Sequence, residues 1–527
     1  MHPGQILPIL LSSVLLILAF PKPDAGVLSL VALVPLIAGL SRSSVPKAFI
    51  SGWGAGTLWF FISYNWVSHS LSTYGGIPLP LAELAIILLA AVHGFYIGLF
   101  SLLIPVVAGS KERGIGVSEY RRNGDISRVF TQLLTHPFTV LLVLPSVWVL
   151  LEAARTWFPA PFPWLMMGTA FWKIPYAKPL YEVGGVYGVS FWIVMMNVII
   201  WMLIRNSRAA RIRAGAVFVV VLLMPLILIT TAGRDGSLTK LRVGVVQGNI
   251  QQEHKWDESI REDTLRTYLS LTDSAVKQGA RLVVWPETAV PFYYQANQEL
   301  AGRMREFSKS RNVHLVFGSP GYEVSGRDVL LYNRVYHLSP NNDEESYDKT
   351  MLVPFGEYVP LARFMPFIDK LVPGEGEFAR GVWGGPFRTP VYSGALVCYE
   401  ISFPSLVRRE VYDGSVMLIN DTNDAWFGRS WGPYQHLAIS VVRARENRVP
   451  ILRAANTGIS AIIDRSGRII ESIPLNKRGI IVADIDIGGR QTLYTRYGDW
   501  IVILSAAVLS VYFLVLLNVW RSQRWTA

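Results

Sequence analysis

Long apolar runs crowd the first 232 residues of the chain, and one more lies near its C-terminus. A helix needs roughly 20 apolar residues to cross a bilayer, so these runs predict a membrane-embedded helical bundle. We expect about eight transmembrane helices, near residues 5–20, 26–41, 48–68, 80–109, 137–154, 183–204, 214–232 and 499–520. The first run has no Lys or Arg ahead of it and no small-residue cleavage site before Pro21, which favours an uncleaved helix over a signal peptide.

Between the last two of these runs the pattern changes to short apolar stretches that alternate with amphipathic ones. Strands are expected at 241–246, 281–285, 313–317, 329–338, 394–399, 416–420, 461–464 and 480–485, and helices near 259–278, 298–311, 404–412 and 433–448. Strand alternating with helix predicts a layered α/β domain. The pair 461–464 and 468–472 reads as a hairpin, so the sheet is expected to be mixed.

The position of the charged residues decides what the net charge of +11 means. Only 17% of the residues are charged, below the roughly 25% of soluble domains. The basic residues of the short loops concentrate around 42–47, 111–128, 205–213 and 521–524. Because basic loops stay in the cytoplasm, both termini are expected there and the α/β domain outside, in the periplasm. The positive net charge therefore reflects the orientation of the chain in the membrane, and it excludes a nucleic-acid-binding protein.

We therefore expect three regions along the chain. Residues 1–232 hold transmembrane helices 1–7, residues 233–498 form the external domain, and residues 499–527 hold the last helix and a cytoplasmic tail.

Three expected strand ends carry residues capable of chemistry. Glu287 follows one strand, Lys349 begins a loop with two prolines and a glycine, and Cys398, the only cysteine, ends a third strand. A single thiol excludes an intramolecular disulfide and a multi-cysteine zinc site. Each residue alone is also typical of an ordinary role: a capping carboxylate, a surface charge, a buried small side chain. Together they suit attack on a carbonyl, with Glu taking the thiol proton and Lys stabilising an oxyanion. No histidine lies near Cys398 in the sequence, so the base is expected to be a carboxylate.

The motifs around these residues resemble those of the nitrilase superfamily. They are Trp285-Pro286-Glu287-Thr288, Leu352-Val353-Pro354-Phe355-Gly356-Glu357-Tyr358-Val359-Pro360 and Cys398-Tyr399-Glu400, with 62 residues from Glu287 to Lys349 and 49 from there to Cys398. With the membrane helices included, the whole chain resembles the apolipoprotein N-acyltransferases of bacterial inner membranes. The resemblance implies an αββα sandwich for the external domain.

The same resemblance implies a role for each residue. Cys398 would be the nucleophile, Glu287 the general base and Lys349 the oxyanion stabiliser. Glu357, Tyr399 and Glu400 match residues around the family's pocket, Trp256 matches a tryptophan on a mobile loop, and Asn333 is a further candidate for shaping the site.

The implied reaction is ping-pong acyl transfer. A phospholipid, typically phosphatidylethanolamine, would give its sn-1 chain to Cys398. The α-amino group of a diacylglyceryl-cysteine at an apolipoprotein N-terminus would then take that chain. No cofactor or metal is implied, and a monomer in the bilayer is expected.

Two other functions stay open at this point. A membrane-anchored amidase or nitrilase would use the same three residues on a small amide. A transporter with an external binding domain would need paired charges in several spans, where only Glu83 and His93 stand out. The polar stretch 420–428 lacks the spacing of a calcium loop, and the basic run 443–453 is assigned a structural role on a helix face.

Overall fold

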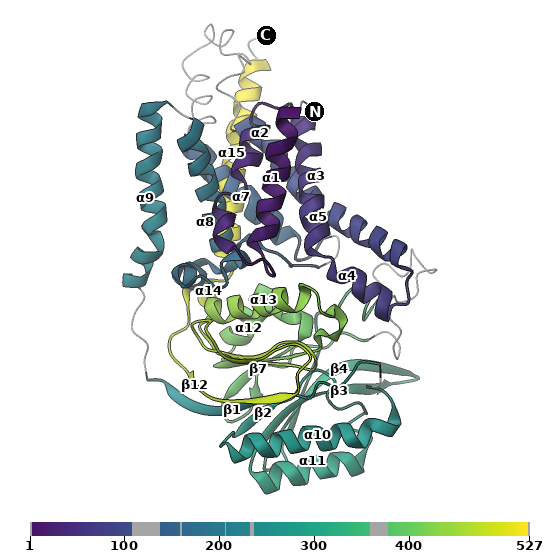
Figure 1. Ribbon diagram of the computed structural model, residues 1–527. Helices are drawn as coiled ribbons and strands as arrows, with labels where there is room; N and C mark the ends of the chain where they lie inside the picture. Colours follow the sequence, from purple (N-terminus) through teal and green to yellow (C-terminus); the bar gives the residue numbers. More distant parts are fainter. Residues whose placement is uncertain are drawn as a thin grey trace. The chain divides into compact units, whose positions relative to one another are not determined.

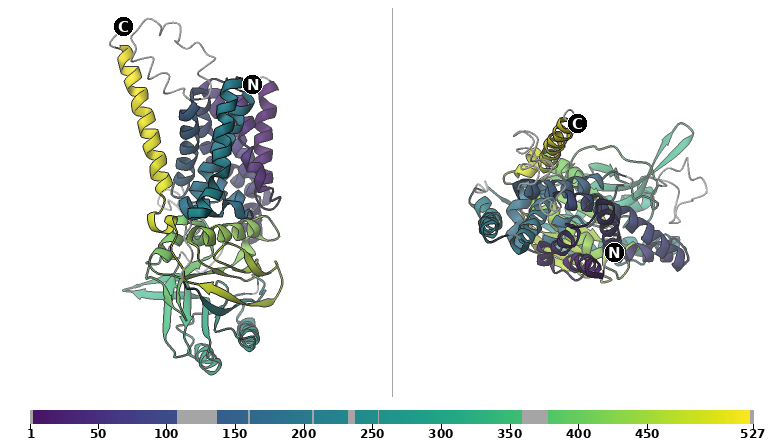
Figure 2. Two further views of the ribbon diagram at one scale, coloured as in Figure 1. Left: turned by 90° about the vertical axis from the view of Figure 1, so that its left-hand side faces the viewer. Right: turned by 90° about the horizontal axis from the view of Figure 1, so that it is seen from above.

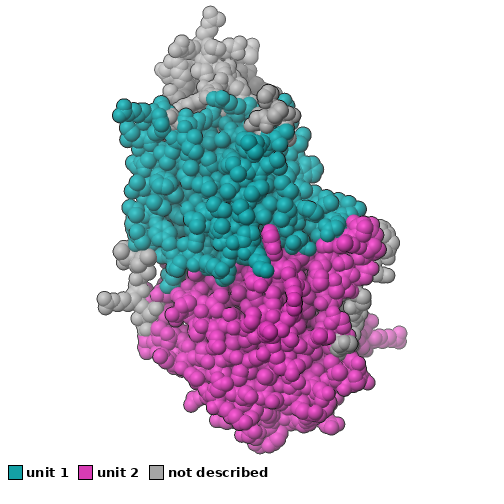
Figure 3. Space-filling model, viewed as in Figure 1, with its two compact units in different colours: residues 1–65, 83–232, 499–527 teal, residues 66–82, 233–498 magenta. Residues whose placement is uncertain are grey.

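The computed structural model describes residues 3–107, 137–158, 161–205, 207–231, 237–253, 255–358 and 378–524. The chain divides into two compact units, coloured separately in Figure 3: unit 1 holds residues 1–65, 83–232 and 499–527, and unit 2 holds 66–82 and 233–498. The basic loop 111–128 and the last two residues of the Leu352–Pro360 motif lie outside the described residues.

Unit 1 is helical, and its helices run side by side (Figure 2). The helices are α1 (Pro3–Ala19), α2 (Val34–Leu40), α3 (Val45–Ser63), α5 (Leu79–Val107, whose first residues belong to unit 2), α7 (Pro137–Ala154), α8 (Lys178–Arg205), α9 (Arg208–Thr231) and α15 (Trp500–Arg524). Short 3-10 turns are η1 (Gly26–Leu30), η4 (Met167–Phe171) and η5 (Pro175–Ala177).

Several of these helices suit a membrane by length and composition. Among the described residues four do so fully, namely Leu79–Val107, Pro175–Arg205, Arg208–Leu228 and Trp500–Asn518, and three apolar helices are shorter, namely Ile6–Ala19, Gly26–Leu40 and Phe138–Ala154. Apolar helices of this kind confirm a membrane protein, whereas the expected number of eight spans stays a prediction.

The expected span near 26–41 is interrupted. It consists of η1 and the seven-residue α2, with a break between them. The Asn197 side chain of α8 forms hydrogen bonds with the backbone at this break. Its Nδ2 donates to the Ser29 carbonyl at 2.8 Å, and its Oδ1 accepts from the Leu33 N–H at 2.8 Å. In apolar surroundings an unpaired backbone group is costly, so a buried amide side chain that pairs both groups stabilises the broken helix.

Within its described residues, unit 2 contains two six-stranded mixed sheets. The first has the order β12-β1-β2-β3-β4-β5 and the second β11-β10-β9-β8-β7-β6. The strands of the first are β1 (Thr239–Gln247), β2 (Leu282–Val284), β3 (His314–Ser325), β4 (Asp328–Leu338), β5 (Glu344–Asp348) and β12 (Gly479–Ile487). Those of the second are β6 (Phe387–Arg388), β7 (Tyr392–Val397), β8 (Met417–Thr422), β9 (Ile451–Ala455), β10 (Ser460–Ile463) and β11 (Ile469–Ile473).

Helices cover the outer faces of both sheets (Figure 1). They are α10 (Glu258–Lys277) and α11 (Gln298–Arg311) on the first sheet, and α12 (Pro404–Tyr412) and α13 (Gly432–Asn447) on the second; α14 (Leu493–Tyr497) packs on α12 and α13. Apolar side chains from both sheets, such as Val245, Val284, Val397 and Leu452, form one core between them. The layered α/β domain expected from the sequence is thus confirmed, as four layers in the order αββα.

Two sequence expectations need correction in this unit. The run 443–453 is not all helical, because α13 ends at Asn447 and Arg453 lies on β9. The strand expected at 394–399 ends at Val397, because Cys398 has a φ of 49°, outside the range of a strand.

Part of the segment between two expected spans belongs to unit 2. It holds α4 (Trp66–His69) and the π-helical turn η2 (Ser70–Tyr74), which lie against η7 (Asp424–Phe427). The Trp66 indole N–H donates to Gln435 at 3.1 Å, and the Ser70 hydroxyl donates to the Trp426 carbonyl at 2.6 Å. The helix expected to reach residue 68 accordingly ends earlier, with α3 at Ser63.

Candidate active site

The structure brings the three candidate residues to the ends of strands in facing sheets. Glu287 follows β2, Lys349 comes directly after β5, and Cys398 comes directly after β7. Strand ends are where open α/β sheets place functional side chains, because the chain leaves the hydrogen-bonded ladder there. All three side chains are buried, with exposed fractions of 7%, 1% and 8% respectively.

Cys398 sits at a sharp turn between β7 and η6 (Cys398–Ser402). Burial raises the pKa of its thiol to about 12; the Glu287 charge adds to this effect, and the Lys349 charge opposes it. A hydrogen bond with the Thr422 side chain also lowers this pKa. At neutral pH the sulfur is therefore a thiol, and it needs a base before it can act as a nucleophile.

The side-chain amide of Asn333 forms hydrogen bonds with both Glu287 and Glu357. Asn333 of β4 donates from Nδ2 to Glu287 Oε1 at 2.7 Å and to Glu357 Oε1 at 3.0 Å. The Val353 N–H donates to the other Glu357 oxygen at 2.8 Å. Glu287 Oε2 has no hydrogen-bond partner among the described residues, so the base candidate keeps one oxygen open for a proton.

Lys349 lies between the same two carboxylates. Its Nζ is 2.9 Å from the Glu357 carboxylate and 3.8 Å from Glu287 Oε1. Burial alone would lower the pKa of Lys349, but the charges of Glu357 and Glu287 outweigh it and raise that pKa above its ordinary value. The ammonium group therefore stays charged and can stabilise negative charge on a reacting oxygen.

Glu400 forms hydrogen bonds both with the loop after Lys349 and with the last residue of β7, next to Cys398. Its Oε1 accepts from the Thr350 N–H at 2.7 Å, the Met351 N–H at 3.0 Å and the Tyr347 hydroxyl at 2.8 Å. Its Oε2 accepts from the N–H of Val397 at 2.8 Å. One fully buried carboxylate thus holds two separate strand ends together.

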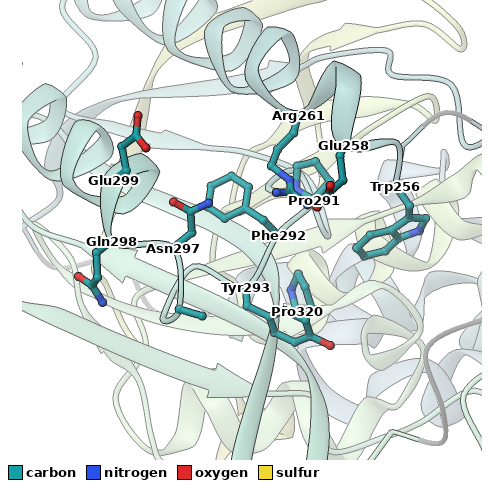
Figure 4. Close-up of a pocket in the computed structure, with 11 residues that line it drawn as sticks. Trp256, Glu258, Arg261, Pro291, Phe292, Tyr293, Asn297, Gln298, Glu299 and Pro320 are labelled. Atoms are coloured by element: carbon teal, nitrogen blue, oxygen red, sulfur yellow. Dashed lines mark hydrogen bonds and ion pairs between the residues drawn. The ribbon is translucent and has the colours of Figure 1, made fainter.

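The two aromatic candidates differ in exposure. Tyr399 is buried in η6 and packs edge-on against Phe403, with ring centroids 5.1 Å apart. Trp256 is 46% exposed and lines a hollow of about 640 Å³. Figure 4 shows Trp256 at one end of this hollow and Glu299 near the other. Glu287, Lys349 and Cys398 do not line it.

Lys255 is a residue near the site that sequence reasoning missed. Its Nζ donates to the Glu287 carbonyl at 3.1 Å and to the Thr288 hydroxyl. Burial lowers the pKa of Lys255 to about 8, against the effect of the Glu287 charge. Its position next to Trp256 was the only signal in the sequence.

A histidine also lies beside Cys398, contrary to what the sequence suggested. His436 Nε2 is 3.1 Å from the Cys398 carbonyl oxygen, although 38 residues separate the two. His436 lies on α13, and only the packing of this helix on the second sheet brings it there. It contacts the backbone of Cys398, so a carboxylate remains the base candidate.

Family models match both parts of the chain. A carbon-nitrogen hydrolase model matches residues 242–494, and an apolipoprotein N-acyltransferase N-terminal domain model matches residues 12–199. Together these two matches cover most of the sequence.

Curated relatives match along nearly the full length. An apolipoprotein N-acyltransferase of Geobacter metallireducens is 36% identical, over 95% of this chain and 93% of the relative. That of Pseudomonas syringae pv. tomato is 31% identical over 94% of each. Among solved structures, an amidase from Nesterenkonia sp. is 18% identical, with a TM-score of 0.35, over 48% of this chain and 92% of the amidase. A carbon-nitrogen hydrolase from Helicobacter pylori is 16% identical, with a TM-score of 0.37, over 52% and 93%.

Proposed function

The chain belongs to the apolipoprotein N-acyltransferase family, and we propose that it moves an acyl chain from a phospholipid, through a thioester on Cys398, to the α-amino group of a lipoprotein N-terminus. The N-acyltransferase role follows from the family. The route, the donor and the residues that carry the reaction are the proposal.

In the first half-reaction Glu287 takes the proton from the Cys398 thiol. The sulfur attacks the carbonyl carbon of the sn-1 ester of a phospholipid such as phosphatidylethanolamine. Negative charge develops on the carbonyl oxygen, where the Lys349 ammonium stabilises it. The ester C–O bond then breaks, Glu287 gives its proton to the leaving oxygen, and a lysophospholipid departs.

In the second half-reaction the neutral α-amino group of a diacylglyceryl-cysteine attacks the thioester. Glu287 takes a proton from the nitrogen, the C–S bond breaks, and the same proton returns to the Cys398 sulfur. An amide bond has formed and the enzyme is as it began. The thioester divides one difficult transfer into two easier steps.

The arrangement of the three buried side chains is the observation that carries this proposal. Glu287 keeps one carboxylate oxygen open, and the Lys349 ammonium lies 3.8 Å from its other oxygen. Together with a buried thiol whose pKa is raised, they supply the base and the cation that acyl transfer needs. Glu357 and Asn333 support the proposal by holding Lys349 and Glu287, and Glu400 by holding both strand ends. Tyr399 and Trp256 are proposed to shape the pocket for the substrates.

We further propose the setting expected from the sequence. The protein lies in the inner membrane as a monomer, with residues 1–232 and 499–527 forming the transmembrane part and residues 233–498 the catalytic domain in the periplasm. Both substrates are lipid-anchored, which gives the apolar helices a purpose beyond anchoring.

Intact-mass measurement of Cys398 tests the proposal. Purified protein is incubated with phosphatidylethanolamine that carries an isotope label in its sn-1 chain. We expect a labelled acyl adduct on the wild type and none on Cys398→Ala, Glu287→Gln or Lys349→Met. Asp263→Asn and Lys277→Met remove exposed charges of α10 and are the matched controls that keep the adduct.

An intact but unmodified Cys398 under turnover conditions would refute the thioester route. Release of ammonia from short amides without lipid would favour the amidase function instead, which the carbon-nitrogen hydrolase match also suggests.

A further inference from the structure

The peptide unit that follows the nucleophile candidate has an unusual backbone conformation. Cys398 has a φ of 49°, in the left-handed region that residues with a side chain rarely adopt. Such conformations persist only where surrounding contacts hold them. The peptide plane between Cys398 and Tyr399 is rigid, so the direction of the Cys398 carbonyl also sets the direction of the Tyr399 N–H.

Two side chains hold that carbonyl. His436 Nε2 lies 3.1 Å from the Cys398 oxygen, and Asn420 Nδ2 donates to it at 3.4 Å. A carbonyl oxygen only accepts hydrogen bonds, so Nε2 of His436 must carry a proton. Asn420 also donates to the Leu396 carbonyl at 3.2 Å, which fixes the end of β7.

One buried ion pair holds both of these side chains. Asp424 Oδ1 is 2.9 Å from His436 Nδ1, and Arg453 donates from Nη2 to Asp424 Oδ2 at 2.7 Å. Arg453 also donates from Nη1 to Asn420 Oδ1 at 2.6 Å. The four side chains are at most 1% exposed. Because Arg453 and His436 hold the pKa of Asp424 down at about 2 despite burial, its carboxylate stays ionised.

This network reaches Cys398 from the helix-covered face of the second sheet. Side chains alternate along β8, and Met417 and Ile419 face the core between the sheets. Asn420 therefore faces the other side, towards α13, which carries His436. In a trans peptide the N–H points opposite to the C=O, so the Tyr399 N–H points away from α13, into the space between the sheets.

We propose that His436 and Asn420 are positioning residues that, by holding the Cys398 carbonyl, aim the Tyr399 N–H at the oxyanion of the tetrahedral intermediate. This inference rests on the proposed function, because it requires attack on an acyl carbonyl. Neither side chain touches the reacting atoms. They act through the one peptide unit that their hydrogen bonds orient.

Two reactions of the same sulfur separate this role from general support of the fold. Acyl transfer passes through an oxyanion and needs the aligned N–H. Alkylation by iodoacetamide forms an S–C bond and releases iodide in one displacement, with the thiol proton going to base, and it develops no oxyanion. Loss of the alignment therefore slows acylation and leaves alkylation unchanged.

His436→Leu and His436→Gln form the test pair. Removing one oxyanion donor costs about 10²- to 10³-fold in kcat, so we expect misalignment by His436→Leu to lower kcat about 10- to 100-fold with KM unchanged. Gln keeps an N–H at similar reach, so His436→Gln should retain more of the acylation rate. Alkylation of Cys398 should stay within about twofold of the wild-type rate in both, because no oxyanion forms.

Two further variants complete the design. His337→Leu is the matched control, since His337 is also buried and bonded to a carboxylate, Glu345, in the same unit; we expect unchanged transfer. Asn420→Leu removes the donor to the Cys398 carbonyl without adding a charge, while Asp424 still pairs with Arg453. It replaces His436→Leu in the test if that variant does not fold. It should show the same split between acylation and alkylation.

The outcomes are distinct. No acyl adduct on the wild type would overturn the proposed function itself. If Cys398 is acylated equally fast in the wild type and in His436→Leu, the positioning role alone is overturned. Parallel losses of acylation and alkylation would also overturn it, because they indicate a purely structural role.

Discussion

The ionisation of Cys398 depends on the charges around it, and among them the Lys349 charge favours the thiolate. Burial and Glu287 raise the pKa of the thiol to about 12, and Lys349 lowers it. A buried cysteine without a nearby cation is inert, because burial keeps it protonated. The Lys349 charge therefore distinguishes Cys398 from an ordinary core cysteine.

Replacing Lys349 should therefore make Cys398 less reactive. In Lys349→Met the thiol pKa rises further, and each added unit makes alkylation at a fixed pH about tenfold slower. The whole pH–rate profile should shift to higher pH. Iodoacetamide labelling between pH 7 and 10 measures this shift, and Lys277→Met, exposed on α10, is the control. An unshifted profile would mean that Lys349 does not act on the sulfur.

Glu410 of α12 is a buried carboxyl group whose titration makes the stability of the fold depend on pH. Burial raises the pKa of Glu410 from 4.5 to about 7, although the Trp383 indole N–H donates to its Oε1 at 2.8 Å. The folded state therefore binds its proton more tightly than the unfolded state, so stability is full at low pH and falls as pH rises from about 4.5 to 7.

Glu410→Gln should remove this loss, on the order of 2–3 kcal/mol across that interval. Thermal unfolding of the detergent-solubilised protein at pH 5 and pH 8 measures it. We expect the midpoint of the wild type to fall more than that of the variant. Equal falls would contradict the raised pKa.

At the scale of elements, strand β3 sets the place of Glu287. A Cβ on Gly318 would lie 2.4 Å from the Thr288 nitrogen and 2.8 Å from the Glu287 Cα. Real atoms do not approach so closely, so any side chain here must push the end of β2 away. The glycine allows the backbone after β2 to pass directly over its neighbour strand.

Gly318→Ala should therefore displace Glu287. We expect a loss of about 1–3 kcal/mol from overpacking and a fall in acyl transfer of tenfold or more from misplacement of the base. Gly302→Ala on α11 is the control, because a Cβ there meets nothing within 4 Å and alanine favours the helix by up to about 1 kcal/mol. Transfer assays and thermal melts check both, and wild-type activity in Gly318→Ala would exclude this role of β3.

Most elements could be predicted because local patterns define them. The helices expected at 259–278, 298–311 and 404–412 agree with α10, α11 and α12 within one residue at each end. β5 and β9 were missed for local reasons too. β5 is a polar strand at the edge of its sheet, and β9 follows a basic helix so closely that the two patterns merge.

At the scale of the whole molecule, the charge pattern predicts orientation. The loops expected in the cytoplasm carry the basic residues, and the domain of residues 233–498 is expected outside. The direction of the chain across the membrane can therefore be tested with single cysteines.

Ser325→Cys and Ser207→Cys, each in a Cys398→Ser background, test the orientation. Both positions are exposed, the first at the end of β3 and the second between α8 and α9. A membrane-impermeant maleimide added to spheroplasts should label the first only, and after lysis it should label both. Labelling of Ser207→Cys in intact spheroplasts would reverse the proposed topology.

The membrane helices, the alternation of strands and helices, and the order of Glu287, Lys349 and Cys398 follow from neighbouring residues, because periodicity and motif spacing are local properties of the chain. The working state of the site depends on contacts between distant segments. Only the pairing of strands and the packing of α13 bring Asn333 between two carboxylates and His436 to the Cys398 carbonyl. Burial between the sheets then turns the only cysteine into a thiol that needs a base, since a low-dielectric interior penalises the charged sulfur.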